Sequence, residues 1–365
     1  MDTTGIKTMD MDDLTYMKKA IELGYKGLGR TAPNPPVGAV IVKNGRIIGG
    51  GFHPRAGMPH AEIYALNSCS EDPAGATLYV TLEPCCHHGK TPPCTDAIIK
   101  AGIKRVVYAV DDPNPIVSCR SGKSLENEGI SVSSGVCGHE AGKLIEWYSK
   151  WMRTGLPFVT LKAATTLDGF IAASNGNSKW ISSEESRKRV HEMRNRMDAV
   201  LVGIGTVITD NPQLTSRIEG ARDPLRVIID RDFVIPAGSK CLGEKCMVIT
   251  ASDKDRDEIS DTGTKIIRSG LNNDGFFDWN DILKIPGAMG LHSVLVEGGS
   301  AVISSLLKAS IADKIILFIA PKILGSGVKL VSWDKTSSID DALGLMIEDV
   351  QTISGDIMIE ARIRG

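Results

Sequence analysis

The first 150 residues mix short apolar runs with apolar residues at helical spacing, and the two patterns alternate along the chain. The runs that have the length and composition of strands are 37–42, 46–50, 77–81 and 105–110. The dipeptide Asn44-Gly45 separates the first two runs and strongly favours a tight hairpin turn. Helices are expected at 17–28, 60–68 and 95–101. Strands that alternate with helices predict an α/β domain in which helices pack against a central sheet.

A break at 155–157, where Gly, Leu and Pro follow a helical pattern, precedes a second series of elements. The expected strands of this series are 158–163, 199–202, 224–230, 246–250, 293–296 and 315–320, with helices at 184–196 and 301–308. We therefore expect two α/β domains, at 1–150 and 151–365, in line with a usual size of about 150 residues per domain. Residues 1–15 lack the apolar core of a signal peptide and predict a frayed tail before the first helix.

The composition narrows the class of protein. Of the 365 residues, 42% are hydrophobic and 24% are charged, as in a folded globular protein. No apolar run approaches the roughly 18 residues of a membrane span, so no membrane partner is expected. Lys and Arg number 42 against 44 Asp and Glu, and this balance does not favour nucleic-acid binding. Eight cysteines in so long a chain do not form a disulfide scaffold, and cytoplasm is the expected compartment.

A cluster of histidine, cysteine and glutamate residues in the first half has the character of a metal site. It consists of H-A-E at 60–62, E-P-C at 83–85 and Cys94. One imidazole and two thiolates hold Zn²⁺ and leave the fourth tetrahedral position to water, which is the arrangement of a catalytic site. Zn²⁺ lowers the pKa of that water towards neutrality. Glu62 stands two residues after the histidine, where it can move a proton, as in the zinc deaminases of bases.

With N-P-P-V-G-A-V-I-V at 34–42 and E-P-C-C-H-H-G-K-T-P-P-C at 83–94, this cluster resembles the deaminase half of the bifunctional riboflavin-biosynthesis deaminase/reductase family. The resemblance implies a cytidine-deaminase-like three-layer fold. It also implies zinc ligands at His60, Cys85 and Cys94, with Glu62 as the catalytic proton shuttle. Asn34 has two interpretations, as a hydrogen-bond partner of the substrate or as the cap of a turn.

Other interpretations of the same residues stay open. Cys86, His87 or His88 would complete a closed structural zinc site in a non-enzymatic binding module, although Glu62 would then have no role. Otherwise, His87 and His88 are expected around the ligands or along the substrate site. A zinc deaminase of a free nucleoside or of tRNA would share the motif, but it would explain neither the second domain nor the P-C-x₈-C spacing.

One stretch departs from the family pattern. Relatives carry V-x-G-x-G shortly after D-D-P-N-P, whereas this chain has Val117, Cys119 and Ser121 at these positions. Glycine alone adopts positive φ freely. If the two replaced glycine positions require positive φ, the loop must take another path in this chain, while the zinc ligands are unaffected.

The second half carries weaker signals of phosphate binding. Gly203 and Gly205 follow one expected strand, and Gly298 and Gly299 stand between another strand and a helix. Unpaired N–H groups at a helix N-terminus favour an anion. The first of these turns fails the dinucleotide fingerprint G-x-G-x-x-G, because its last position is Ile208.

Segments 161–169, 177–181, 205–212, 214–217 and 296–299 occur in the order seen in the reductase half of the same family. This resemblance implies a dihydrofolate-reductase-like fold, which explains the missing fingerprint, and NADPH as the cofactor. The residues that it implies for NADPH are Ala164, Trp180, Thr206, Asp210, Gly298 and Gly299. Those that it implies for the substrate are Ser178, Arg194, Leu214, Arg217 and Glu297. The two arginines suit a sugar phosphate, since guanidinium binds phosphate through two parallel hydrogen bonds.

Structural roles are the alternatives for some of these residues. Arg194 lies in the charged run 187–196, where an arginine usually faces solvent. Trp180 could pack in the core, and Asp168 could only shape the turn before Gly169.

The two resemblances together predict a bifunctional enzyme of riboflavin synthesis. The first domain hydrolytically deaminates a phosphorylated diamino-ribosylaminopyrimidinone. The second domain uses NADPH to reduce the ribosyl group of the deaminated product to a ribityl chain, with Lys162 and Asp210 as candidate proton donors. The expected partners are this small phosphorylated pyrimidine and further copies of the chain, in a homo-oligomer that is a dimer or a tetramer.

Overall fold

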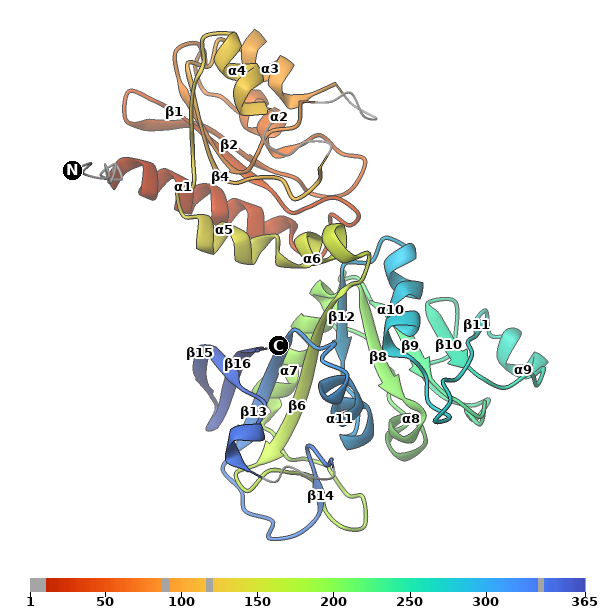
Figure 1. Cartoon of the computed structure of the whole chain (residues 1–365). Coiled ribbons are helices and arrows are strands. Elements are labelled where there is room, and N and C mark those ends of the chain that lie inside the picture. Colours follow the sequence, from red (N-terminus) through yellow and green to blue (C-terminus); the bar gives the residue numbers. More distant parts are fainter. Residues whose placement is uncertain (1–10, 87–91, 116–120, 334–337, 365) are drawn as a thin grey trace. The chain divides into compact units, whose positions relative to one another are not determined.

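A computed structural model describes residues 11–86, 92–115, 121–333 and 338–364 of the chain (Figure 1). The chain divides between Thr154 and Gly155 into two compact units. Each unit has its own sheet and its own hydrophobic core. Within the described ranges, no helix has both the length and the apolar character needed to cross a membrane.

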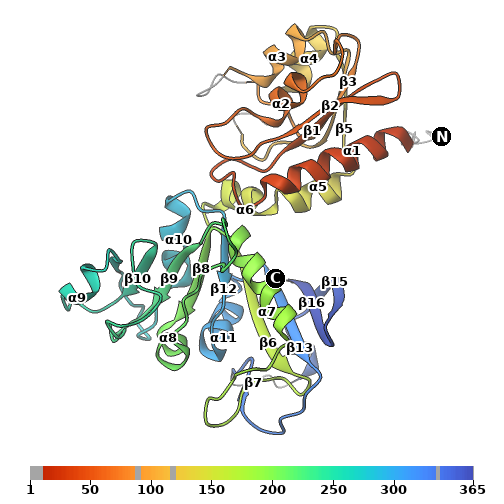
Figure 2. The same ribbon diagram turned by 180° about the vertical axis from the view of Figure 1, so that it is seen from behind.

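The first unit is a five-stranded sheet between two layers of helices. Its strands are β1 (Gly38–Lys43), β2 (Arg46–Phe52), β3 (Thr77–Leu82), β4 (Arg105–Val110) and β5 (Ser131–Ser134). Its helices are α1 (Met11–Gly24), α2 (Ala61–Asn67), α3 (Cys94–Lys100), α4 (Ser121–Asn127), α5 (Gly138–Leu144) and α6 (Glu146–Thr154). In the order β2-β1-β3-β4-β5, the last three strands are parallel. Apolar residues of α2, α3 and α4 pack on one face of the sheet, and those of α1 and α5 pack on the other (Figure 2).

The turn between β1 and β2 confirms the hairpin predicted from Asn44-Gly45. Both residues have positive φ, 49° for Asn44 and 73° for Gly45, as a type I′ turn requires. The return strand β2 extends to Phe52 and is longer than expected. Its glycines allow α2 to approach closely, since a Cβ atom on Gly51 would collide with the side chain of Tyr64.

The expected tail is wrong for residues 11–15, because α1 begins at Met11. The carboxylate of Asp13 is buried and accepts hydrogen bonds from Arg105 Nη1 and Nη2, at 2.8 and 2.7 Å, and from the Tyr79 hydroxyl at 2.7 Å. The hydrogen bonds from Arg105 hold the pKa of Asp13 below its usual value. These contacts connect the start of α1 to β3 and β4. They could not be predicted from the local sequence pattern, because their partners are distant in the sequence.

The second unit is built on a nine-stranded sheet. Its strands are β6 (Phe158–Thr166), β8 (Ala199–Gly203), β9 (Leu225–Ile229), β10 (Cys246–Thr250), β11 (Lys265–Arg268), β12 (Ser293–Val296), β13 (Lys314–Ala320), β15 (Leu345–Ile353) and β16 (Asp356–Ile363). Two short strands, β7 (Phe170–Ala172) and β14 (Val328–Lys329), pair separately. Its helices are α7 (Glu184–Arg196), α8 (Ile204–Asp210), α9 (Asp257–Ser260), α10 (Trp279–Ala288) and α11 (Ser300–Lys308).

The strand order of the large sheet is β11-β10-β9-β8-β12-β6-β13-β16-β15. All pairs from β11 to β13 are parallel, and the hairpin of β15 and β16 adds an antiparallel edge. Helices α10 and α11 bury apolar residues against the centre of this sheet. Because seven strands are parallel, their carboxyl ends meet at one edge, which is where such sheets bind ligands.

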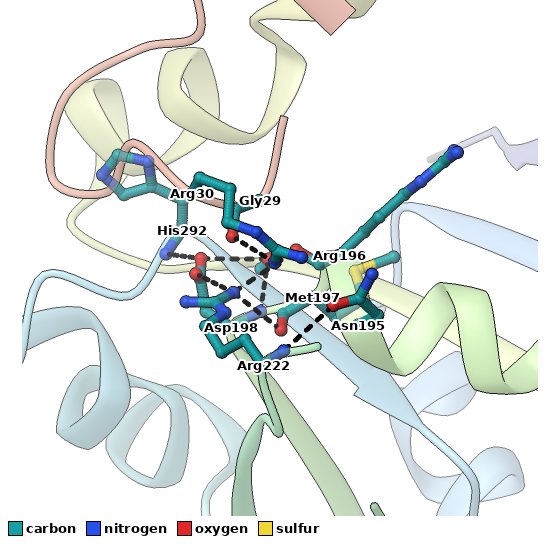
Figure 3. Close-up of polar contacts among 9 residues, drawn as sticks. Gly29, Arg30, Asn195, Arg196, Met197, Asp198, Arg222 and His292 are labelled. Atoms are coloured by element: carbon teal, nitrogen blue, oxygen red, sulfur yellow. Dashed lines mark hydrogen bonds and ion pairs between the residues drawn. The ribbon is translucent and has the colours of Figure 1, made fainter. Parts of the chain in front are cut away.

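At the opposite edge, a polar network joins the amino ends of β8 and β12. Asp198 accepts hydrogen bonds from the His292 N–H and from the Ser293 hydroxyl, both at 3.0 Å. Arg222 Nη2 donates to Asp198 at 3.1 Å and to the Met197 carbonyl at 3.1 Å (Figure 3). This network lies far along the strands from their carboxyl ends, so its role is to fix the strand starts.

Candidate functional site

The predicted metal ligands of the first unit come together in the fold. His60 precedes α2, Cys85 follows β3, and Cys94 is the first residue of α3. The His60 Nδ1 atom lies 3.2 Å from Cys94 Sγ and 3.6 Å from Cys85 Sγ. All three donor atoms lie within 4.8 Å of one another. The ends of one strand and two helices therefore bring a single N, S, S donor set to one point.

This donor set fits Zn²⁺. Nitrogen and thiolate sulfur are the ligands that zinc prefers, and three protein ligands leave one tetrahedral position for water. Among the described residues, His60, Cys85 and Cys94 form the group of ligating side chains that lie close enough together to hold a metal ion. Cys86 does not belong to this group. The closed-site interpretation therefore loses Cys86 as fourth ligand, whereas His87 and His88 lie outside the described residues.

The electrostatics of the cluster shift the pKa values of its thiols and of the nearby carboxyl group. A hydrogen bond from Cys94 lowers the pKa of Cys85 to about 4, while the same contact raises the pKa of Cys94. Glu62 lies in the first turn of α2 and is only 3% exposed. Burial and the charge at Cys85 raise the pKa of Glu62 above its usual value. A raised pKa makes the Glu62 carboxylate a stronger base, which suits a group that takes up a proton.

A second histidine, which the sequence does not single out, lies beside the cluster. The His53 ring packs edge-on against the His60 ring, with centroids 5.5 Å apart. Its Nδ1 lies 2.9 Å from the Pro59 carbonyl oxygen, and its Nε2 lies 3.1 Å from Asn34 Nδ2. His53 thus fixes the residue before the ligand and connects it to Asn34, a third role beside the two expected. His53 could not be predicted to lie beside the metal ligands, because it is a single histidine outside any recognisable motif.

The loop that departs from the family pattern does not need glycine at Ser121. Ser121 begins α4, is fully buried and is not among the residues with positive φ. Its N–H and its hydroxyl both donate to Glu83 Oε1, at 3.1 and 2.8 Å. Glu83 stands two residues before the ligand Cys85, so Ser121 supports the start of the ligand segment. Cys119 lies outside the described residues.

In the second unit, the predicted residues gather at the carboxyl ends of neighbouring parallel strands. Ala164 lies on β6, Glu297 and Gly298 follow β12, and Thr206 lies in the helix after β8. The strands β8, β12 and β6 are adjacent in the sheet. Gly299 faces Thr206, whose Oγ1 would lie 3.9 Å from a Cβ atom at this glycine.

Arg194 and Glu297 form a buried bidentate ion pair. Arg194 Nε donates to Glu297 Oε1 at 2.6 Å, and Nη2 donates to Oε2 at 2.9 Å. Burial opposes the ionisation of Glu297, but the Arg194 guanidinium outweighs it and lowers the pKa of Glu297. Burial lowers the pKa of Lys162, which lies close enough for the charge of Glu297 to act on it. The alternative in which Arg194 faces solvent is therefore wrong, since Arg194 is 9% exposed.

The segment that contains two further predicted substrate residues, Leu214 and Arg217, has an unusual backbone. Leu214 and Arg217 have positive φ, 58° and 54°, which costs energy for residues other than glycine. Arg194 Nη1 donates to the Thr215 carbonyl at 3.0 Å and so links this segment to the ion pair. Leu214 is buried and Arg217 is exposed, where its guanidinium is accessible to a ligand.

The predicted residues Ser178 and Trp180 lie in an exposed segment between β7 and α7. Trp180 is 62% exposed, so core packing is not its role. The Arg187 guanidinium lies 4.4 Å from the centre of its ring. Lys179 Nζ lies 3.5 Å from Asp210 Oδ1, which brings Asp210 next to this segment.

Gly298 is required by packing. A Cβ atom at this position would lie 2.8 Å from Val302 Cβ, closer than side chains tolerate. Val302 belongs to α11, the helix that begins at the turn. The glycine therefore lets the first turn of α11 close over the end of β12, with the free N–H groups of its N-terminus at the sheet edge.

Comparisons with known families match the two structural units separately. The model "Cytidine and deoxycytidylate deaminase zinc-binding region" matches residues 10–110, and the model "RibD C-terminal domain" matches residues 157–359. The expected fold class is thereby confirmed: a cytidine-deaminase domain followed by a RibD reductase domain of dihydrofolate-reductase-like fold.

Full-length relatives share both halves. The riboflavin biosynthesis protein RibD of Aquifex aeolicus is 44% identical over 353 residues, which cover 95% of this chain and 97% of that protein. The solved structure of RibD from Acinetobacter baumannii is 39% identical, with a TM-score of 0.88 and coverage of 97% of this chain and 99% of that chain. A structure from Thermotoga maritima, of a diaminohydroxyphosphoribosylaminopyrimidine deaminase/5-amino-6-(5-phosphoribosylamino)uracil reductase, is 43% identical, with a TM-score of 0.85 and coverage of 97% and 99%.

The donor set predicts one zinc ion per chain. We expect His60→Ala, Cys85→Ser and Cys94→Ser each to lose most of the bound zinc after dialysis against a weak chelator, because two remaining ligands cannot hold the ion. Cys69→Ser is the matched control, since Cys69 is a packed thiol of the same unit outside the donor set. The measurement is zinc content by plasma mass spectrometry, and full zinc in Cys94→Ser would contradict the assignment.

Proposed function

The chain belongs to the RibD family of bifunctional riboflavin-biosynthesis enzymes, and from this membership we propose which residues carry its two reactions. It is a deaminase and a reductase, with a zinc-binding site and a reductase domain that uses NAD(P)H. The convergence of His60, Cys85 and Cys94 beside the buried Glu62 is the observation that carries the proposal. We assign deamination to 1–150 and reduction to 151–365.

The first reaction replaces a ring amino group by oxygen. The proposed substrate is the phosphorylated diaminopyrimidine for which the Thermotoga maritima deaminase is named. Zn²⁺ held by His60, Cys85 and Cys94 supplies a Lewis acid that lowers the pKa of a water ligand. The carboxylate of Glu62 takes a proton from the attacking water and delivers it to the amino nitrogen. The C–N bond then breaks, ammonia leaves, and a carbonyl remains on the ring.

The placement of Glu62 suits this proton transfer. It is buried beside the donor set rather than part of it, so its oxygens are available to the substrate. Its raised pKa makes the carboxylate a stronger base towards the attacking water. His53 packs against the His60 ring and is itself held by Asn34 and by the Pro59 carbonyl.

The second reaction opens the ribose ring of 5-amino-6-(5-phosphoribosylamino)uracil, the compound for which the Thermotoga maritima reductase is named. NADPH, our choice between the two nicotinamide cofactors, supplies a hydride that forms the new C–H bond at C1′. The bond from C1′ to the ring oxygen breaks, and that oxygen takes a proton. We propose that Ala164, Trp180, Thr206, Asp210, Gly298 and Gly299 bind the cofactor. The proposed substrate residues are Ser178, Arg194, Leu214, Arg217 and Glu297.

Two observations support Lys162 over Asp210 as the proton donor. Burial lowers the pKa of Lys162, so its ammonium gives up a proton more readily than an exposed lysine does. The nearby charge of Glu297 opposes this shift only in part. Asp210 is engaged with Lys179 at 3.5 Å and is a third exposed.

The nucleoside and tRNA deaminase alternatives have less support. They leave unexplained a second unit whose length matches the RibD C-terminal domain. The full-length relatives are RibD proteins rather than single-domain deaminases.

We propose that the chain forms a homo-oligomer, a dimer or a tetramer, and acts in the cytoplasm. The edge strand β15 carries exposed apolar side chains at Leu345, Ile347 and Val350, which are 47%, 62% and 55% exposed. An exposed, apolar edge strand pairs readily with another strand. Cys69, Cys137 and Cys241 are free thiols, which fits a reducing compartment.

Glu62→Gln tests the deaminase assignment. The amide keeps the volume but cannot take a proton from water, so we expect the rate of ammonia release to fall at least about 10³-fold. Zinc content and the NADPH-dependent reduction of the deaminated substrate serve as controls and should stay at the wild-type level. Ammonia release within tenfold of the wild-type rate would remove Glu62 from the mechanism.

Introducing negative charge on strand β15 tests whether this strand forms the oligomer interface. We expect the wild-type chain to elute as a dimer or larger, and the double variant Ile347→Asp, Val350→Asp to shift towards the monomer mass, because aspartate cannot be buried unpaired in an interface. Phe276→Asp is the control, since Phe276 is 64% exposed and lies away from β15. The readout is light scattering after size exclusion, and a monomeric wild-type chain would refute the proposal.

A further inference from the structure

We propose that Lys322 is a positioning residue of the reductase site. Its ammonium group holds the segment 178–182, which carries Ser178 and Trp180, in the conformation that receives cofactor and substrate. The inference rests on the proposed function, because it takes Trp180 as a cofactor contact. It assigns a role to a residue that lies outside the segments by which this chain resembles the reductase half of the family.

The contacts of Lys322 support this role directly. Its Nζ atom donates hydrogen bonds to the carbonyl oxygens of Trp180 and Ile181, at 2.7 and 2.8 Å. Hydrogen bonds from a charged donor are shorter and stronger than neutral ones. Two consecutive carbonyls converging on one ammonium fix the direction of the backbone as it leaves Trp180. The direction of the backbone sets where the indole ring points.

Lys322 can act as a support because its own loop is fixed. The loop after β13 passes beside the turn after β6, since the carboxyl ends of these strands are paired at Ala320 and Thr166. The Lys322 carbonyl accepts a hydrogen bond from the Leu167 N–H at 2.8 Å. The loop is thus attached to the turn at the residue that precedes Asp168.

Asp168 fixes the next part of the same loop. Its carboxylate accepts hydrogen bonds from the Leu324 N–H at 3.1 Å and from the Gly325 N–H at 2.7 Å. The Thr166 hydroxyl donates to it at 2.6 Å. The Thr166 hydrogen bond and the two backbone donors lower the pKa of Asp168 to about 2, so the carboxylate stays charged. Asp168 therefore does more than shape the turn before Gly169.

Burial cannot hold the segment 178–182, since Trp180 is 62% exposed. Polar contacts of basic residues hold it instead. Besides Lys322, Arg187 Nη1 donates to the Ser182 carbonyl at 2.7 Å, and its guanidinium covers one face of the Trp180 ring. Lys179 reaches Asp210 in the opposite direction. Lys322 adds a contact from the loop that follows β13.

Loss of the Lys322 contact should reduce the fraction of chains that hold the segment in the binding conformation. The apparent Kd of a ligand rises in inverse proportion to that fraction. Once the cofactor and substrate are bound, the segment is ordered again, so the chemical step is unchanged. The expected signature is a rise in Kd and KM for NADPH, and in KM for the pyrimidine, without a fall in kcat.

The experiment compares Lys322→Met with the wild type in the full-length, zinc-loaded protein. We expect the Kd for NADPH by calorimetry and the KM for NADPH to rise about tenfold, with kcat within twofold. Hydrogen–deuterium exchange of the peptide 178–182, without cofactor, should become faster while other peptides keep their rates. Lys322→Arg should restore most of the affinity because it retains a charged donor. Deaminase activity should not change.

Two further variants separate the possible failures. Lys329→Met removes an exposed lysine from the neighbouring strand β14 and should leave the Kd unchanged, which excludes a general effect of charge. Trp180→Ala should weaken NADPH binding by itself. If Trp180→Ala weakens NADPH binding and Lys322→Met does not, the inference is wrong and the proposed contact stands.

The other possible results of these experiments would each overturn the proposed role of Lys322. If Trp180→Ala leaves the Kd unchanged, the proposed contact is wrong and the inference falls with it. If Lys322→Met raises the Kd while exchange of 178–182 keeps its rate, Lys322 acts on the cofactor directly and positioning is overturned. A fall in kcat with an unchanged Kd would likewise overturn it.

Discussion

Parallel strand pairing is the constraint on which both sites depend. In a parallel sheet all strands end at the same edge, and the chain leaves that edge through loops and helix N-termini. In the first unit, the end of β3 delivers Cys85, and the starts of α2 and α3 deliver His60 and Cys94. In the second unit, the ends of β6, β8 and β12 place residues far apart in the sequence beside one another. The same geometry thus brings together the metal ligands of the first unit and the proposed cofactor residues of the second.

Buried charges give each site its chemistry because each is balanced by a specific partner. Glu297 is ionised at the edge of the core only because Arg194 binds it through two hydrogen bonds, and this pair in turn leaves Lys162 in a charged, poorly solvated surrounding. For Glu62, burial and the charge at Cys85 outweigh the influence of His60 and push the carboxyl towards its protonated form. The surroundings of these two buried carboxyls therefore shift their pKa values in opposite directions.

Much of this organisation could be predicted from the sequence, because apolar runs and motif residues are local signals. The strands 105–110 and 246–250 occur as expected, and the H-A-E and P-C residues meet in one cluster. What the sequence could not predict depends on distant partners. The start of α1 depends on Asp13 pairing with Arg105, and Lys322 acts on backbone carbonyls, which have no sequence signature. The edge strand β15 was not predicted because its side chains are mostly exposed and form no buried run.

The central claim is that one chain performs deamination and then reduction on the same pyrimidine. Mass spectrometry of the products, from purified zinc-loaded protein and the phosphorylated diamino-ribosylaminopyrimidinone, tests it most directly. The account predicts exchange of one amino group for oxygen without NADPH, and the gain of two further hydrogens when NADPH is added. Reduction of the diamino substrate before any loss of ammonia, or exchange with no reduction in the presence of NADPH, would contradict it.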